Sequence, residues 1–137
     1  MRYMIIVKAT AGSEAGVMPG EALMAAMAAF HEELARAGVL LDASGLKPSS
    51  AGWRIRFDGT QRRLIDGPFT QARELVAGCT LIQVRSRDEA LEWSRRFPNP
   101  ATEGGVGEIE VRPLFELDDF EPTAAVKRFR TLEAGRA

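Results

Sequence analysis

Hydrophobic and polar positions recur with two different periods along this chain, and the change of period divides it into strands and helices. Residues 3–8 are a short apolar run typical of a β-strand. Residues 9–20 are rich in glycine and small side chains and are expected to be a loop. From Glu21 to Ala37, apolar residues recur at every third or fourth position, which predicts a helix with one apolar face; they are Leu23, Met27, Phe30, Leu34 and Ala37.

The middle of the chain favours strands. Residues 39–49 predict an irregular strand with a bulge at Ser44-Gly45. Residues 52–67 predict a hairpin, because apolar and basic side chains alternate there and Asp58-Gly59 supplies turn residues. A short helix is expected at residues 71–76.

The second half repeats the strand-then-helix order. Residues 79–85 are expected to be a central strand, and Ser86 with Glu89 forms a capping box that opens a helix ending before Pro98. Residues 108–117 alternate cleanly between apolar and polar side chains, which indicates a last strand. We therefore expect a folded domain over residues 1–117 and a polar tail over 118–137 with a weak helical pattern.

This order of elements predicts an α+β fold with an antiparallel sheet. Strand, helix, strand, hairpin, helix, strand is the split βαβ, ferredoxin-like order (βαββαβ) with an inserted hairpin and short helix. Such a sheet carries helices on one face only, and the chain has no further long amphipathic helix for the other face. An uncovered apolar sheet invites aggregation, so we expect a homodimer with two-fold symmetry that packs through the open face.

Composition and charge remove several classes of function. The 137 residues favour a single domain, and a formal net charge of −1 with interspersed signs gives no field that would favour nucleic acid or a membrane surface. The apolar start reads as a strand and not as a signal peptide, so a cytoplasmic protein is expected. One cysteine (Cys79) and one histidine (His31) exclude an intrachain disulfide and disfavour a transition-metal site. Since no phosphate-binding glycine loop is present either, we expect no cofactor.

Five segments of the chain resemble, in order, the blocks of the YCII-related family, also called the DGPF-domain family. They are MRYMIIV at the start, ELARAGVLLDASGLKP, DGPFTQARELVAGCTLIQV, DEALEWSRRFP and IEVRPL. The resemblance covers residues 1–115 and implies a dimeric α/β barrel, in which two ferredoxin-like protomers pack their sheets together. It also implies a His–Asp pair in a cleft as a candidate active site, and one relative has a dehydrochlorination of a chlorinated hydroquinone attributed to it.

Two residues are the candidate catalytic pair. Asp66 begins the Asp-Gly-Pro-Phe tetrapeptide, where its carboxylate accepts hydrogen bonds from the following turn, or acts in a cleft as a general base or as the group that orients His31. His31 is the side chain that most readily exchanges a proton near neutral pH, and it lies on the flank of the apolar stripe of its helix. A bystander at the surface and an acid/base group in a cleft are both open for His31, and spacing alone does not decide whether it meets Asp66.

Three further residues are candidates for substrate binding. Tyr3 opens the first strand, Phe69 closes the tetrapeptide, and Arg73 could bind an anionic group. Two functions follow. The first is a cofactor-independent acid/base enzyme of isomerase or lyase type that uses His31 and Asp66 on a small organic molecule. The alternative is a non-catalytic homodimer that binds a small ligand or another protein.

Overall fold

The structure, a computed structural model, describes residues 1–136 apart from the side chains of Arg73 and Glu103. Its strands are β1 (Arg2–Lys8), β2 (Leu40–Gly45), β3 (Trp53–Asp58), β4 (Gln61–Asp66), β5 (Val76–Gln83) and β6 (Ile109–Pro113). Its α-helices are α1 (Ala11–Glu14), α2 (Glu21–Arg36), α3 (Arg87–Arg95) and α4 (Ala124–Ala134).

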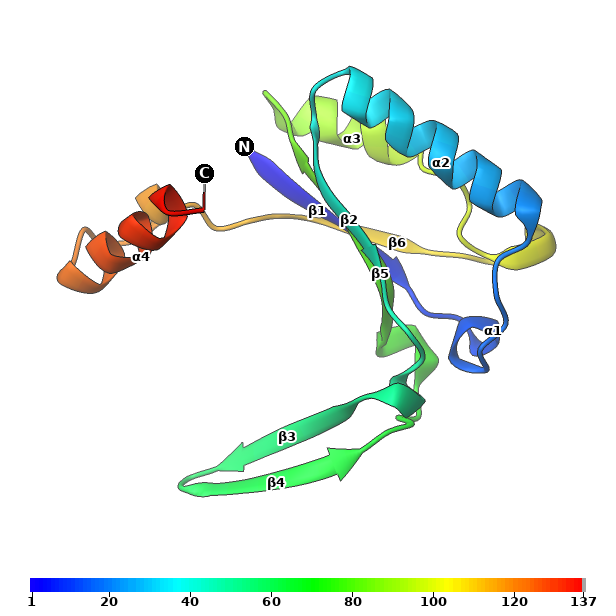
Figure 1. Ribbon diagram of the computed structural model, residues 1–137, viewed down its shortest axis with the longest axis horizontal. Coiled ribbons are helices and arrows are strands. Elements are labelled where there is room, and N and C mark those ends of the chain that lie inside the picture. Colours follow the sequence, from blue (N-terminus) through cyan, green and yellow to red (C-terminus); the bar gives the residue numbers. More distant parts are fainter. Residues whose placement is uncertain (137) are drawn as a thin grey trace.

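The main sheet confirms the predicted ferredoxin-like fold. Its strand order is β2-β5-β1-β6, and every neighbouring pair is antiparallel. Helices α2 and α3 lie together on one face of this sheet, as Figure 1 shows. With the hairpin set aside, the strands follow the order second, third, first, fourth, which is the order of a split βαβ fold.

The core lies between these two helices and one half of the sheet. Phe30 and Leu34 of α2 are buried against Ile5 of β1 and Ile82 of β5. The Phe30 ring also meets the Phe97 ring edge-on, with 5.2 Å between the ring centroids. Each such buried side chain contributes roughly 1.5–3 kcal/mol to stability, so the apolar stripe of α2 fixes the rotation of the helix over the sheet.

The other half of the sheet presents small residues to the helices. Ala43 and Gly45 of β2 pair with Thr80 and Gly78 of β5. A Cβ atom on Gly78 would come within 2.8 Å of the Ser44 carbonyl oxygen, so glycine permits the close approach of the two strands. Small side chains cannot fill the space beneath α2, and the sheet and helix therefore enclose a hollow at this end.

The hairpin and the C-terminal helix both extend away from this compact body. Strands β3 and β4 form a separate two-stranded sheet. In Figure 1 this hairpin and α4 project on the side of the main sheet that α2 and α3 leave uncovered.

The Asp-Gly-Pro-Phe tetrapeptide forms the turn that joins the hairpin to the body. Its Gly67-Pro68 peptide bond is cis. The Gly67 N–H donates to the Gly52 carbonyl oxygen at 3.0 Å, and the Phe69 N–H donates to Ser49 Oγ at 3.0 Å. The Ser49 N–H and hydroxyl in turn donate to the carboxylate of Glu14 at the end of α1. The turn therefore holds together segments that lie far apart in the sequence.

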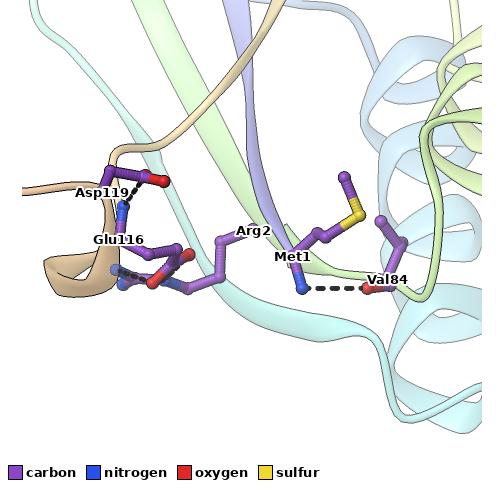
Figure 2. Close-up of polar contacts among 5 residues, drawn as sticks. All are labelled: Met1, Arg2, Val84, Glu116 and Asp119. Atoms are coloured by element: carbon purple, nitrogen blue, oxygen red, sulfur yellow. Dashed lines mark hydrogen bonds and ion pairs between the residues drawn. The ribbon is translucent and has the colours of Figure 1, made fainter.

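A charged contact ties the C-terminal segment to β1. The guanidinium of Arg2 donates two hydrogen bonds of 3.0 Å to the carboxylate of Glu116, and Asp119 accepts the Glu116 N–H at 2.7 Å (Figure 2). The hydrogen bonds from Arg2 lower the pKa of Glu116, and the same contact raises the pKa of Arg2.

Several local expectations were wrong. The irregularity of β2 lies between Leu40 and Asp42 and not at Ser44-Gly45, because the close approach at Gly78 keeps the end of β2 in register. The expected loop at 9–20 contains α1, which a capping box between Thr10 and Ser13 begins. The expected helix at 71–76 is a 3₁₀ turn, Ala72–Glu74.

Candidate functional site

A cavity of about 660 Å³ fills the hollow between α2 and the small-residue half of the sheet. The segment that carries α1 borders it, and its walls are mainly apolar, with contributions from Met18, Leu23, Met24, Met27 and Phe97. Three of these residues are methionines, whose flexible thioether side chains adapt to ligands of different shape. The volume and the lining are typical of a site for a small organic molecule.

His31 lies at the wall of this cavity with both ring nitrogens engaged. Nδ1 lies 2.7 Å from the Met27 carbonyl oxygen, one turn earlier in α2. Nε2 lies 2.8 Å from Oγ1 of Thr80, which projects from β5. The rings of Phe30 and Phe97 pack edge-on against the imidazole, with centroid distances of 5.6 and 6.1 Å. The ring is therefore fixed in position and half-buried.

The partners of the ring determine which nitrogen carries the hydrogen in neutral His31. A carbonyl oxygen can only accept a hydrogen bond, so Nδ1 donates to Met27. Nε2 then carries the lone pair and accepts from the Thr80 hydroxyl. Thr80 is 2% exposed, and it lines the cavity together with His31. The single lone pair of Nε2 is thus taken by the Thr80 hydroxyl, and this hydroxyl links the imidazole to the cavity that both residues line.

The charges around the cavity are few. Lys47, which follows β2, is the single lysine among the described residues that line it, and no aspartate or glutamate is among them. No group of three or more metal-binding side chains occurs in the described part of the chain. The groups that the cavity offers a ligand are thus an imidazole, hydroxyls and one ammonium.

The structure places the other candidate residues elsewhere. Asp66 is exposed at the end of β4, opposite Trp53, and no described hydrogen bond or ion pair joins it to His31. Tyr3 is buried in the core, and the Phe69 ring lies under the guanidinium of Arg54, whose carbon is 3.8 Å from the ring centroid. None of these three lines the cavity. The side chain of Arg73 lies outside the described residues.

Sequence reasoning missed Thr80, although the sequence carries a signal for it. Along residues 79–85, Thr80 alternates with Cys79 and Leu81 and shares the covered face with Ile82 and Val84. A hydroxyl on the apolar face of a central strand needs a hydrogen-bond partner. That requirement marks Thr80 as a residue to examine, but the partner itself lies 49 positions away.

Comparison with known proteins fixes the family. The model of the YCII-related domain matches residues 1–118, which span all six strands. The chain belongs to the YCII-related family. This member is 34% identical over 96 residues to an uncharacterised protein of Rhizobium meliloti (strain 1021), a match that covers 69% of this chain and 74% of that one.

A solved structure resembles this family member more distantly. It is 5-chloro-2-hydroxyhydroquinone dehydrochlorinase from Burkholderia phenoliruptrix AC1100, in complex with 2,5-dihydroxybenzoquinone. The TM-score is 0.45 at 16% identity, over 84% of this chain and 94% of that chain. As for membranes, none of the described helices is long and apolar enough to cross a bilayer.

Proposed function

We propose that this YCII-related protein binds a small, largely apolar organic molecule in the cavity and that His31 transfers a proton to and from it. The observation that carries the proposal is the imidazole itself, which is fixed at the cavity wall by Met27 and Thr80. A fixed base within reach of a bound molecule is the geometry that general acid–base catalysis requires.

The proton transfer needs no cofactor. The Thr80 hydroxyl relays the proton: its oxygen takes a proton from an acidic position of the ligand while its own proton passes to Nε2 of neutral His31. The Met27 carbonyl stabilises the resulting imidazolium by accepting the Nδ1 hydrogen bond. In an isomerisation the imidazolium returns the proton to another atom of the ligand. In an elimination it gives the proton to the departing group.

The sequence made Asp66 a candidate partner of His31; within one chain, the hydrogen bonds of His31 to Thr80 and Met27 support these two residues in that role instead. The exposed position of Asp66 supports its role as a residue of the turn, where the following Gly67 and Phe69 are already hydrogen-bonded. The rival function is binding of a ligand without turnover. The same cavity serves that function too, and the two differ only in whether His31 changes a bound molecule.

We further propose that the protein is a homodimer that packs through the open face of its sheet. Met4 and Ile6 of β1 lie opposite Leu81 and Cys79 of β5 on that face. All four are half-buried in a single chain, so they form an apolar row that a second copy would cover.

The test uses the single histidine as a reporter. Small phenols, quinones and unsaturated acids are added to the protein while the His31 ring resonances are followed by NMR, and each ligand that shifts them is then assayed for conversion. Ala43→Leu fills the cavity from the sheet side and should abolish the shifts. Ala29→Leu, the same change on the exposed side of α2 and away from the cavity, should preserve them.

The outcomes separate the two functions. If a bound ligand is converted, His31→Gln should lower the rate by about 10²-fold or more, as expected for loss of a general base. If ligands bind and none is converted, the binding function replaces the enzyme. If Ala43→Leu leaves the shifts unchanged, the cavity is not the site.

A further inference from the structure

The β3–β4 hairpin lacks the support that a two-stranded sheet needs. Isolated hairpins are at best marginally stable in water. Cross-strand register places Trp53, Ile55, Phe57 and Leu64 on one face of this hairpin. Trp53 and Phe57 are each 63% exposed and Leu64 is 59% exposed. Large apolar side chains gathered in this way mark a surface that another molecule covers.

The charges of the hairpin are also unbalanced. Arg56 and Arg63 lie directly opposite each other on the other face of the hairpin, and like charges in that position are destabilising. Arg62 lies over the Phe57 ring on the apolar face, at 4.9 Å from the centroid. None of these three arginines takes part in an ion pair among the described residues. On the apolar face, where Asp66 opposite Trp53 is the one carboxylate of the described strands, a molecule that packs against Arg62 should therefore offer a carboxylate as well as apolar surface.

The C-terminal segment 115–121 has the complementary composition. Phe115 and Phe120 are exposed, and their ring centroids lie 5.1 Å apart. Asp118, Asp119 and Glu121 flank Phe120 in the sequence; Asp118 pairs with Arg130 and Asp119 accepts the Glu116 N–H, whereas Glu121 has no ion-pair partner among the described residues. An aromatic pair within an acidic segment is the kind of surface that an apolar, arginine-bearing hairpin face fits.

The two surfaces lie at opposite ends of the same sheet. The hairpin leaves the sheet where Gly45, Gly78 and Val7 are paired, whereas the C-terminal segment leaves it beyond Pro113, which pairs with Tyr3. Both project on the side without helices, so they flank the open face (Figure 1). A second copy packed on that face would lie between them.

Two-fold symmetry leaves two ways to arrange the second copy. An axis parallel to the strands would bring both arginine-rich hairpins to the same end of the dimer, which charge repulsion disfavours. An axis perpendicular to the strands would bring the hairpin of each copy to the same end as the C-terminal segment of its partner, with the hairpin at the β2–β5 edge and the segment at the β6 edge. We propose this second arrangement, in which the Trp53, Ile55, Phe57 and Leu64 face docks on segment 115–121 of a second copy of this chain, with Arg62 near the partner's Glu121. It rests on the dimer proposed above.

The test is a charge-reversal cycle on the full chain, with the dimer dissociation constant measured by sedimentation velocity. Arg62→Glu and Glu121→Arg should each raise the dimer dissociation constant by about tenfold, because each contact occurs twice in a two-fold symmetric dimer. The double variant should recover most of the wild-type affinity. Phe57→Ser should weaken the dimer as well. Arg87→Glu at the start of α3 and Val106→Ser, whose side chain is 94% exposed in a loop, are matched controls that should leave it unchanged.

Each outcome bears on a separate part of the proposal, provided that circular dichroism shows each variant folded. A wild-type chain that stays monomeric at all concentrations overturns both the dimer and the docking. If Leu81→Arg dissociates the dimer and the hairpin variants have no effect on it, the dimer through the open face stands and the docking of the hairpin is wrong. If Arg62→Glu and Glu121→Arg each weaken the dimer and the double variant does not recover the affinity, the hairpin does not dock on segment 115–121. If the wild-type chain binds single-stranded RNA, and Arg62→Glu abolishes this binding without affecting the dimer, the partner of the hairpin is nucleic acid and not a second copy of the chain.

Discussion

Replacing Gly67 by alanine should test the role of the tetrapeptide turn directly. A Cβ atom at position 67 would overlap the carbonyl oxygen of Ser49 and lie 2.7 Å from its carbonyl carbon. Both are backbone atoms of the turn at residues 49–52, so no side chain can rotate away to make room. The segment 49–52 or the tetrapeptide must move.

The size of the effect follows from the contacts that this movement breaks. The hydrogen bonds from Gly67 to Gly52 and from Phe69 to Ser49 each contribute about 1 kcal/mol. Overpacking adds roughly 1–3 kcal/mol. We therefore expect the free energy of unfolding to fall by about 3–5 kcal/mol. An unfolding entropy of about 2.1 cal/mol/K per residue converts this loss to a decrease in Tm of about 10–17 °C for a chain of this length.

Differential scanning calorimetry measures the change in Tm, and hydrogen exchange of the Ser49 and Phe69 amides reports whether the turn itself opens. Gly45→Ala is the matched control, because a Cβ atom there meets no heavy atom within 4 Å. If the Gly67→Ala protein melts within a degree of this control and both amides stay protected, the close packing of the turn does not constrain position 67, and our reasoning is wrong.

Three other changes test the remaining contacts. Thr80→Val removes the hydroxyl beside His31 Nε2 at nearly constant shape and should lower the free energy of unfolding by about 1 kcal/mol in urea titrations. It should also shift the His31 ring resonances, whereas Thr80→Ser keeps the hydroxyl and should leave those resonances near their wild-type positions. Glu14→Ala removes the acceptor of the Ser49 N–H and hydroxyl, so amide exchange should rise in residues 10–17 and stay unchanged in α3. Glu116→Gln tests the contact with Arg2. Because this contact lowers the pKa of Glu116, its stabilisation is present above the ordinary value of 4.5 and is lost as the pH falls through the lowered pKa. Wild type should therefore melt slightly higher than Glu116→Gln at pH 7, and the difference should disappear once the pH falls below the lowered pKa of Glu116.

The sequence by itself determined the fold class, because the periods of its apolar residues are local properties. The stripe from Leu23 to Leu34 predicts α2 almost to the residue, and the alternation around Asp58-Gly59 predicts the hairpin. The order of these elements is enough to select the ferredoxin-like sheet. The tetrapeptide and the segments around it also identified the family.

Only the tertiary structure decided which side chains meet at the candidate site. Whether His31 meets Asp66 or Thr80 depends on the rotation of α2 over the sheet and on the register of β5, which are set by packing between residues far apart in the chain. The cavity exists because small residues of β2 and β5 lie beneath α2, and no local pattern shows which helix will cover them. Asp66 lies apart from His31 because the hairpin leaves the sheet on the side away from the helices. Periodicity determines which face of an element is buried, but packing determines what that face meets.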